Sequence, residues 1–275
     1  KAYGDCKALS NYMFSLLKEA GIRSQYALIK AGEYNYFMAS DFPSNQFNHA
    51  ILCVPFAKDS LWLECTSQTQ PAGYMGNFTG NRKALLIDEN GGTLVNTPFY
   101  ASEENQQLRT IKGSIDAGGT LHMKVNTTYK AFQQDNLHSM INQLSKDRVK
   151  EILQKQLSLA NYHVASFNYK ENKEVVPDIE EQLDIEVNNY ATITGKRLFI
   201  VPNLLNRTGT QLSADEKRKY EVELLYPYRD VDSIEVTLPA GYVVEALPQP
   251  VKLQTPFGAY SSSVKIENDK LIYGR

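Results

Sequence analysis

Three residues near the start of the chain, Cys6, His49 and Glu64, have the side-chain types of a nucleophilic catalytic triad. A cysteine nucleophile needs a base that removes its proton, and that base needs an acceptor that orients it. The cysteine comes first, the histidine follows on a predicted strand, and the carboxylate lies on the next predicted strand. This order predicts a Cys-His-Glu triad for acyl-transfer chemistry.

A helix is predicted to hold the cysteine. Apolar residues recur with helical period from Cys6 onward and predict a helix over residues 6–20. Asp5 precedes it as an N-cap, and Gly21 follows it where a C-terminal cap would lie. A thiol at the first helical position lies at the positive end of the helix dipole, which favours the nucleophilic thiolate. The alternative is a small buried hydrophobe at a helix start.

The other two residues are predicted to lie on a β-hairpin, with strands at 48–56 and 61–66. In an antiparallel hairpin, the numbers of two residues that face each other add up to the same sum at every facing pair. If the sum is odd, His49 and Glu64 share a face, and Cys53 and Cys65 lie on opposite faces and stay reduced. If it is even, the triad hypothesis fails. Taken singly, the histidine is as readily structural and the glutamate as readily a solvated charge.

The rest of the N-terminal part is predicted to alternate strands with loops. Strands are expected at 24–31, 82–88 and 93–95, with a polar and aromatic loop at 32–47 and a surface loop at 66–80. Four aromatic residues before the histidine strand fit either a substrate cleft or ordinary packing: Tyr26, Tyr34, Tyr36 and Phe37.

The second part of the chain has a different pattern. Alternating residues at 108–114 and 120–130 flank a turn at 117–119, and helical periodicity at 137–157 is interrupted at 145–147. Strand-like segments follow to the end, several of them separated by Pro or Gly turns: 183–190, 197–201, 220–225, 233–238 and 262–266. This spacing predicts a β-sandwich-like domain with a helical insertion at about 136–158. The predicted domains are 1–103 and 104–275.

Composition excludes several classes of function. The net charge of −2 gives no basis for binding nucleic acid, and no apolar run approaches the length that spans a bilayer. Three cysteines are too few for a disulfide scaffold, and no zinc or Ca²⁺ motif is present, so no cofactor or metal is expected. The chain starts at Lys1 and stops within a strand-like segment, so we expect it to be a fragment.

The triad segments resemble the three signature segments of the transglutaminase-like superfamily. They read Gly4-Asp5-Cys6, Asn48-His49-Ala50 and Trp62-Leu63-Glu64-Cys65-Thr66. The layout after them, from Gly80 through Leu94, is similar to a subgroup from Bacteroidetes in which β-rich domains of unknown function flank the core. Two features depart from the family: Glu64 stands where Asp is usual, and the segment that precedes the cysteine helix is missing.

The resemblance implies a fold and a function. The fold is expected to be α+β, with a papain/transglutaminase-like core of a helix packed on an antiparallel sheet, followed by the β-sandwich-like domain. Cys6 would be the nucleophile, His49 the base and Glu64 its orienting group. The backbone N–H of Cys6 would be the oxyanion donor that this chain offers. The bacterial members suggest hydrolysis of peptide or isopeptide amides in an exported protein, with a peptide or protein as substrate.

Two alternatives stay open. The chain could be a catalytically inactive scaffold or binding module at the cell surface, because a fold alone does not fix an activity. Cys6, His49 and Glu64 could also be metal ligands, a site that would need an open coordination position for water.

Overall fold

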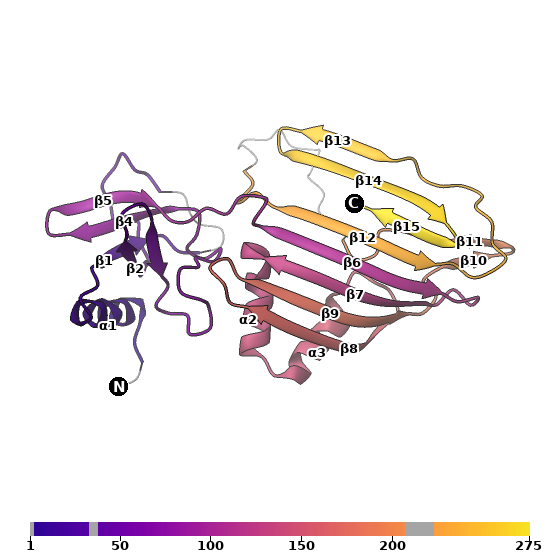
Figure 1. Cartoon of the computed structure of the whole chain (residues 1–275), viewed down its shortest axis with the longest axis horizontal. Coiled ribbons are helices and arrows are strands. Elements are labelled where there is room, and N and C mark those ends of the chain that lie inside the picture. Colours follow the sequence, from indigo (N-terminus) through magenta and orange to yellow (C-terminus); the bar gives the residue numbers. More distant parts are fainter. Residues whose placement is uncertain (1–2, 33–37, 207–222) are drawn as a thin grey trace.

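The structure is a computed structural model that describes residues 3–32, 38–206 and 223–275. It consists mainly of two antiparallel-rich sheets that lie one after the other along the long axis of the molecule (Figure 1). Three of the aromatic residues considered for a substrate cleft, Tyr34, Tyr36 and Phe37, lie outside the described residues. The first half of the predicted strand at 220–225 does so as well.

The first sheet has five antiparallel strands in the order β3-β2-β1-β4-β5. Its strands are β1 (Gln25–Ile29), β2 (His49–Pro55), β3 (Ser60–Leu63), β4 (Lys83–Asp88) and β5 (Gly91–Asn96). One face carries a buried apolar cluster that includes Ile51, Cys53 and Trp62, and Met75 from the long β3–β4 loop (residues 64–82) covers it. Every residue of β2 except Pro55 is buried, because β2 lies between β1 and β3 and is covered by α1 (Cys6–Glu19).

Helix α1 (Cys6–Glu19) packs against β1 and β2. The Asp5 carboxylate accepts a hydrogen bond of 2.9 Å from the Ala8 N–H, which is the N-cap that the sequence predicted. Gly21 has φ +72°, and its N–H and that of Ile22 bond to Lys18 and Leu17, which closes the helix as predicted. The sheet does not bury all of the apolar residues that recur with helical period along α1, since Tyr12 is 65% exposed.

The second sheet has eight strands in the order β13-β14-β15-β12-β6-β7-β9-β8, and all neighbours are antiparallel except β12 and β6. The strands are β6 (Gln106–Ile115), β7 (Leu121–Lys130), β8 (Tyr162–Asn172), β9 (Asp178–Val187), β12 (Arg229–Thr237), β13 (Val251–Thr255), β14 (Gly258–Glu267) and β15 (Lys270–Gly274). A short ribbon of β10 (Thr192–Thr194) and β11 (Arg197–Phe199) lies beside it.

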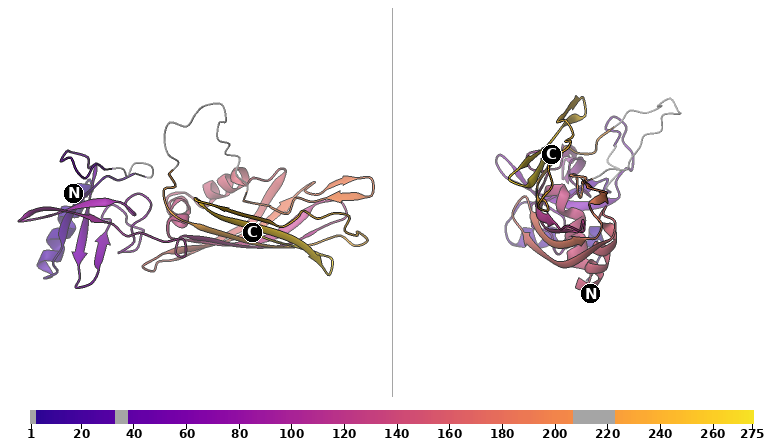
Figure 2. Two further views of the ribbon diagram at one scale, coloured as in Figure 1. Left: turned by 90° about the horizontal axis from the view of Figure 1, so that it is seen from above. Right: turned by 90° about the vertical axis from the view of Figure 1, so that its right-hand side faces the viewer.

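Helices cover one face of this second sheet (Figure 2). They are α2 (Asp135–Gln143) and α3 (Lys146–Gln156), preceded by the 3₁₀ turn η1 (Ala131–Gln134). Alternate residues of β6, β7 and β9 point into the core beneath them, and Val149 and Leu153 of α3 close it. The predicted helical segment is indeed interrupted, because the Ser145 hydroxyl accepts from the Arg148 N–H and starts α3 as its N-cap.

The predicted fold class is wrong. The chain is mostly β, with 41% strand and 15% helix, so the α+β expectation with a papain-like core of helix on sheet is not supported. The predicted β-sandwich is wrong as well, because β12 and β13–β15 extend the same sheet as β6–β9 instead of forming a second one. Helices α2 and α3 take the place of the second layer. The domain boundary predicted at residue 103 falls between β5 and β6 and stays a prediction.

Candidate functional site

The structure joins two of the three predicted site residues. The Glu64 carboxylate lies 3.0 Å and 2.9 Å from His49 Nε2 through its two oxygens, and the side chains are only 8% and 14% exposed. The hairpin register explains this meeting, since Leu52 faces Leu63 and Cys53 faces Trp62, which gives the odd index sum. His49 is the first residue of β2, and Glu64 follows the last residue of β3.

This pairing fixes the imidazole tautomer. A carboxylate accepts hydrogen bonds, so His49 Nε2 carries the proton that it donates to Glu64. In the neutral ring the lone pair is then on Nδ1, the nitrogen that can remove a proton from a thiol. The ring of Phe78 packs edge-on against the imidazole, with centroids 5.4 Å apart, and holds its plane.

Thr66 holds the other side of the carboxylate. Its hydroxyl donates to Glu64 Oε1 at 2.5 Å and its backbone N–H donates to the same oxygen at 3.2 Å. Burial by itself would raise the pKa of Glu64, but the hydrogen bonds from His49 and Thr66 outweigh it, so the pKa is lowered. Glu64 is therefore an anion at neutral pH, as an orienting group must be.

Cys6 is the first residue of α1, as predicted, and is half-buried. One turn further along the helix, the fully buried Ser10 hydroxyl donates to the Ala50 carbonyl at 2.9 Å, and Ala50 is the neighbour of His49. Residues four apart lie on the same side of a helix, so Cys6 lies one turn from this contact. No hydrogen bond joins Cys6 Sγ to His49 within the described ranges.

The other two cysteines are also free thiols. Cys53 is buried in the sheet core, and burial raises the pKa of its thiol. Burial also raises the pKa of Cys65, which lies beside Ser10. The charge of Glu64, the preceding residue, also contributes to the raised pKa of Cys65. Burial thus disfavours the reactive thiolate at both Cys53 and Cys65.

Two residues interact with members of the predicted triad although the triad pattern did not include them. The pKa of Tyr26 is raised, mainly by burial and further by the charges of Cys6, Asp5 and Cys65. The phenol of Tyr26 therefore lies near the start of α1. Thr66 is the second, and the sequence offered a signal for it, because a Thr two residues after a Glu can bond back to the carboxylate. Across the described part of the chain, no three His, Cys, Asp or Glu residues are arranged to hold a metal ion.

A second histidine–glutamate pair joins the two sheets. His138 of α2 is buried, its Nδ1 lies 2.6 Å from Glu171 Oε1, and its Nε2 lies 2.8 Å from the Thr69 hydroxyl. The glutamate is on β8 and the threonine on the β3–β4 loop. Sequence reasoning assigns no role to His138, because a single His on a helix carries no pattern.

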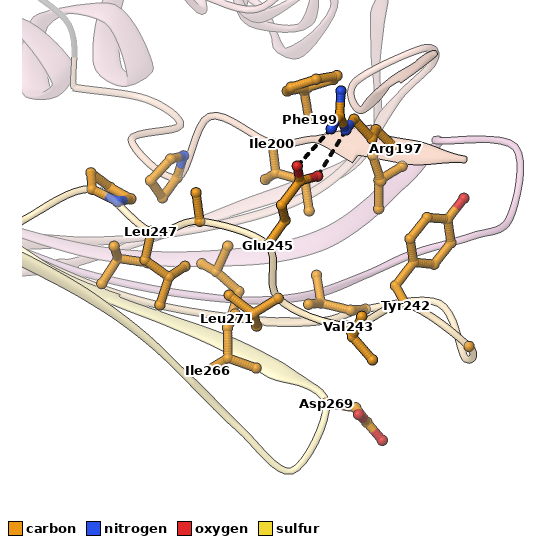
Figure 3. A pocket seen from close by; sticks show the side chains of 18 of the residues that line it. Arg197, Phe199, Ile200, Tyr242, Val243, Glu245, Leu247, Ile266, Asp269 and Leu271 are labelled. Atoms are coloured by element: carbon orange, nitrogen blue, oxygen red, sulfur yellow. Dashed lines mark hydrogen bonds and ion pairs between the residues drawn. The ribbon is translucent and has the colours of Figure 1, made fainter. Parts of the chain in front are cut away.

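A cavity of about 910 Å³ lies at the far end of the second sheet from α1. Figure 3 shows aliphatic side chains such as Ile266 and Leu271 on its wall and the Arg197 guanidinium bonded to Glu245 by two contacts of 2.8 Å. None of the predicted site residues lines it, so the cavity is separate from the His49 site.

Comparisons with known proteins cover the chain unevenly. The model of a family described as "Domain of Unknown Function with solved-structure structure" (DUF3858) matches residues 196–275, which include every residue that lines the cavity. None of the curated proteins matches the chain. A solved structure from Parabacteroides distasonis, described as a "putative protease", is similar over 99% of this chain and 37% of its own, with 11% identity and a TM-score of 0.42. The chain thus spans little more than a third of that protein, and a similarity this low carries no argument about activity.

In the part of the chain that the structure describes, no helix is both long enough and apolar enough to cross a membrane.

Proposed function

We propose that this chain carries the catalytic centre of a cysteine-dependent amide hydrolase of the transglutaminase-like superfamily. Cys6 is the nucleophile, His49 the general base and Glu64 the group that orients the base. The observation that carries the proposal is the His49–Glu64 pair, in which Glu64 accepts a hydrogen bond from Nε2–H and leaves Nδ1 free to accept a proton. A solvated surface pair would not fix the tautomer in this way.

The reaction follows from these roles. The Cys6 thiol gives its proton to His49 Nδ1, and the sulfur attacks the carbonyl carbon of an amide. The oxyanion that forms accepts a hydrogen bond from the Cys6 N–H, which has no intrahelical acceptor because it lies in the first turn of α1. The imidazolium then protonates the leaving amine as the C–N bond breaks, which gives a thioester.

Water completes the cycle. His49 accepts a proton from a water molecule, the resulting hydroxide attacks the thioester carbon, and the carboxylic acid leaves as Cys6 regains its proton. An amine in place of water would give transamidation. We propose hydrolysis of peptide or isopeptide amides, because the layout after the triad is similar to that of bacterial members of the superfamily, which resemble peptidases more than cross-linking enzymes.

Selective alkylation tests the proposal. The purified chain is treated with iodoacetamide at mildly acidic pH, and the three thiols are followed separately by peptide mass spectrometry. Cys6 should react faster than Cys53 and Cys65, whose pKa values burial raises, and His49→Ala should remove this advantage. Equal rates at all three thiols in the native chain, with no effect of His49→Ala, would show that the thiol is not activated.

Hydrolysis is tested separately with a fluorogenic peptide library, with Cys6→Ser as the control that keeps the size of the side chain. Turnover that is lost in Cys6→Ser supports the hydrolase. An activated Cys6 with no turnover of any library member would favour the binding-module alternative.

A further inference from the structure

The β3–β4 loop surrounds the His49–Glu64 pair and also touches the second sheet. It starts with Glu64, and its Phe78 packs on the His49 ring. Near its middle, Tyr74 is buried in an aromatic cluster with Tyr100 and Phe132, which lie outside the first sheet. The loop is therefore held from both sides, and its contacts to the second sheet bear on the position of the pair.

Asp135, the first residue of α2, makes the central contact. Its carboxylate is 8% exposed and accepts hydrogen bonds from the Tyr74 hydroxyl at 2.7 Å and from the Asn77 N–H at 2.6 Å. Gln134 donates a third at 2.7 Å. A carboxylate with several short donors is a strong and directional anchor.

The anchored residue is adjacent in sequence to the one that touches the imidazole. Asn77 gives its backbone N–H to Asp135, and the next residue is Phe78, whose ring lies 5.4 Å from that of His49. The buried Arg82 guanidinium donates to the Asn77 carbonyl at 2.6 Å, so both sides of this peptide segment are held. A shift of the Asn77 backbone would therefore move Phe78 directly against His49.

The loop has a second anchor nearer to Glu64. The Thr69 hydroxyl bonds to His138 Nε2, and His138 in turn bonds to Glu171 of β8. Asn142 also donates to Glu171 at 2.9 Å, so the carboxylate is held in place. Both anchoring side chains, Asp135 and His138, come from α2 of the second sheet.

Gly76 shows how closely the loop approaches α2. A Cβ on this residue would lie 2.9 Å from Asp135 Oδ2, which is closer than carbon and oxygen pack. The absence of a side chain at Gly76 thus allows the Asn77 N–H to reach the carboxylate.

We propose that Asp135 is a positioning residue for the His49–Glu64 pair and acts through Asn77 and Phe78, so that the second sheet sets the geometry of the catalytic centre. The catalytic meaning of this role rests on the proposed function. The geometric role does not, because the orientation of the His49 ring can be measured without any substrate.

Asp135→Asn tests the proposal. The amide keeps the shape of the side chain but removes the charge and one of the acceptor oxygens, so either the Tyr74 hydroxyl or the Asn77 N–H loses its acceptor. We expect the ¹⁵N and ¹H signals of the His49 ring to shift and to show a mixture of tautomers. The rate of Cys6 alkylation should fall about tenfold, since a displacement of the order of 1 Å costs up to about 10²-fold in a catalytic geometry.

Asp147→Asn is the matched control. Asp147 is also an aspartate in the first turn of a helix, α3, but it is exposed. This substitution removes the same helix-dipole interaction, so it should leave the His49 signals and the Cys6 rate unchanged. Thr69→Val, which removes only one hydroxyl, provides a milder second test at the other anchor and should shift the His49 signals in the same direction.

The outcomes separate the two proposals. If Asp135→Asn is folded and His49 keeps its signals, the positioning role is refuted. If Asp135→Asn does not fold, Gly76→Ala decides instead, because its Cβ would lie 2.9 Å from Asp135 Oδ2 and would push the loop away from this carboxylate. Unchanged His49 signals in Gly76→Ala refute the role. If the signals shift while Cys6 of the native chain shows no enhanced alkylation, the positioning role is supported and the proposed hydrolase is refuted.

Discussion

Replacement of Glu64 by Gln is the sharpest test of the catalytic geometry, because it changes charge and leaves size almost unaltered. One carboxylate oxygen accepts from Thr66 and His49, and the other lies 2.9 Å from His49 Nε2. If the oxygen of the new amide stays on Thr66, its NH₂ group faces Nε2. Two donors then oppose each other, so the ring moves its proton to Nδ1 and Nε2 becomes the acceptor. The nitrogen that should remove the thiol proton is thereby protonated.

The size of the effect follows from the role of the tautomer. In hydrolase triads, the corresponding carboxylate-to-amide change lowers kcat by about 10⁴-fold. At about 1.4 kcal/mol for each factor of ten, this corresponds to roughly 5 kcal/mol of transition-state stabilisation. The free energy of unfolding should fall by less, about 1.5–3 kcal/mol, which is the value of a hydrogen bond to a charged group.

Three measurements check this: peptide hydrolysis, the His49 tautomer by ¹⁵N NMR, and urea unfolding. Glu186→Gln is the control, since Glu186 also pairs with a histidine, His122, at 3.5 Å, but both side chains are about half exposed. An exposed pair contributes little, so the control should change none of the three by more than experimental error. If Glu64→Gln keeps the native rate and the Nε2–H tautomer, Glu64 does not orient the base.

Two further predictions concern pH and stability. Thr66→Val removes one of the hydrogen bonds that lower the pKa of Glu64, so this pKa should rise. A lowered pKa in the folded state stabilises the protein above the unfolded pKa of about 4.5, and this stability is lost as the pH falls through the folded pKa. Thermal unfolding followed from pH 6 to pH 3 should therefore show that the variant loses stability at a higher pH than the native chain. Asp232→Leu removes the buried carboxylate that lies 3.6 Å from Arg109 and 2.9 Å from Arg275. Urea unfolding should show a loss of about 3–5 kcal/mol, because both guanidinium groups lose this partner. A loss below about 1 kcal/mol would mean that other contacts, such as that of Arg275 with Asp230, compensate for it.

Local patterns predicted the local structure well. The N-cap at Asp5, the C-terminal cap at Gly21 and the break between α2 and α3 at 145–147 all depend on interactions within a few residues, which a sequence displays directly. The sequence left two possibilities for the hairpin, an odd or an even sum of facing residue numbers, because side chains alternate along a strand. The structure has the odd sum.

The fold class could not be predicted in the same way. Alternation shows that a strand has one apolar face but not what covers that face, so a helical layer and a second sheet look alike in sequence. The strands β12 and β13–β15 therefore fitted a sandwich, whereas they extend the existing sheet. The β3–β4 loop was expected at the surface from its polar composition, yet Tyr74 and Met75 are fully buried. Met75 packs into the core of the first sheet, and Tyr74 packs into the aromatic cluster with Tyr100 and Phe132.

The two histidine–glutamate pairs with a buried histidine, His49–Glu64 and His138–Glu171, show how hydrogen bonding distinguishes a base from an anchor. His138 uses both ring nitrogens, Nδ1 toward Glu171 and Nε2 toward Thr69, so none is left to exchange a proton with a substrate or a thiol. His49 uses only Nε2, and its Nδ1 bonds to no residue in the described ranges. A ring that is oriented on one side and open on the other is the arrangement that general base catalysis requires. The same side-chain pair thus supports two different roles, and the partner of the second nitrogen decides between them.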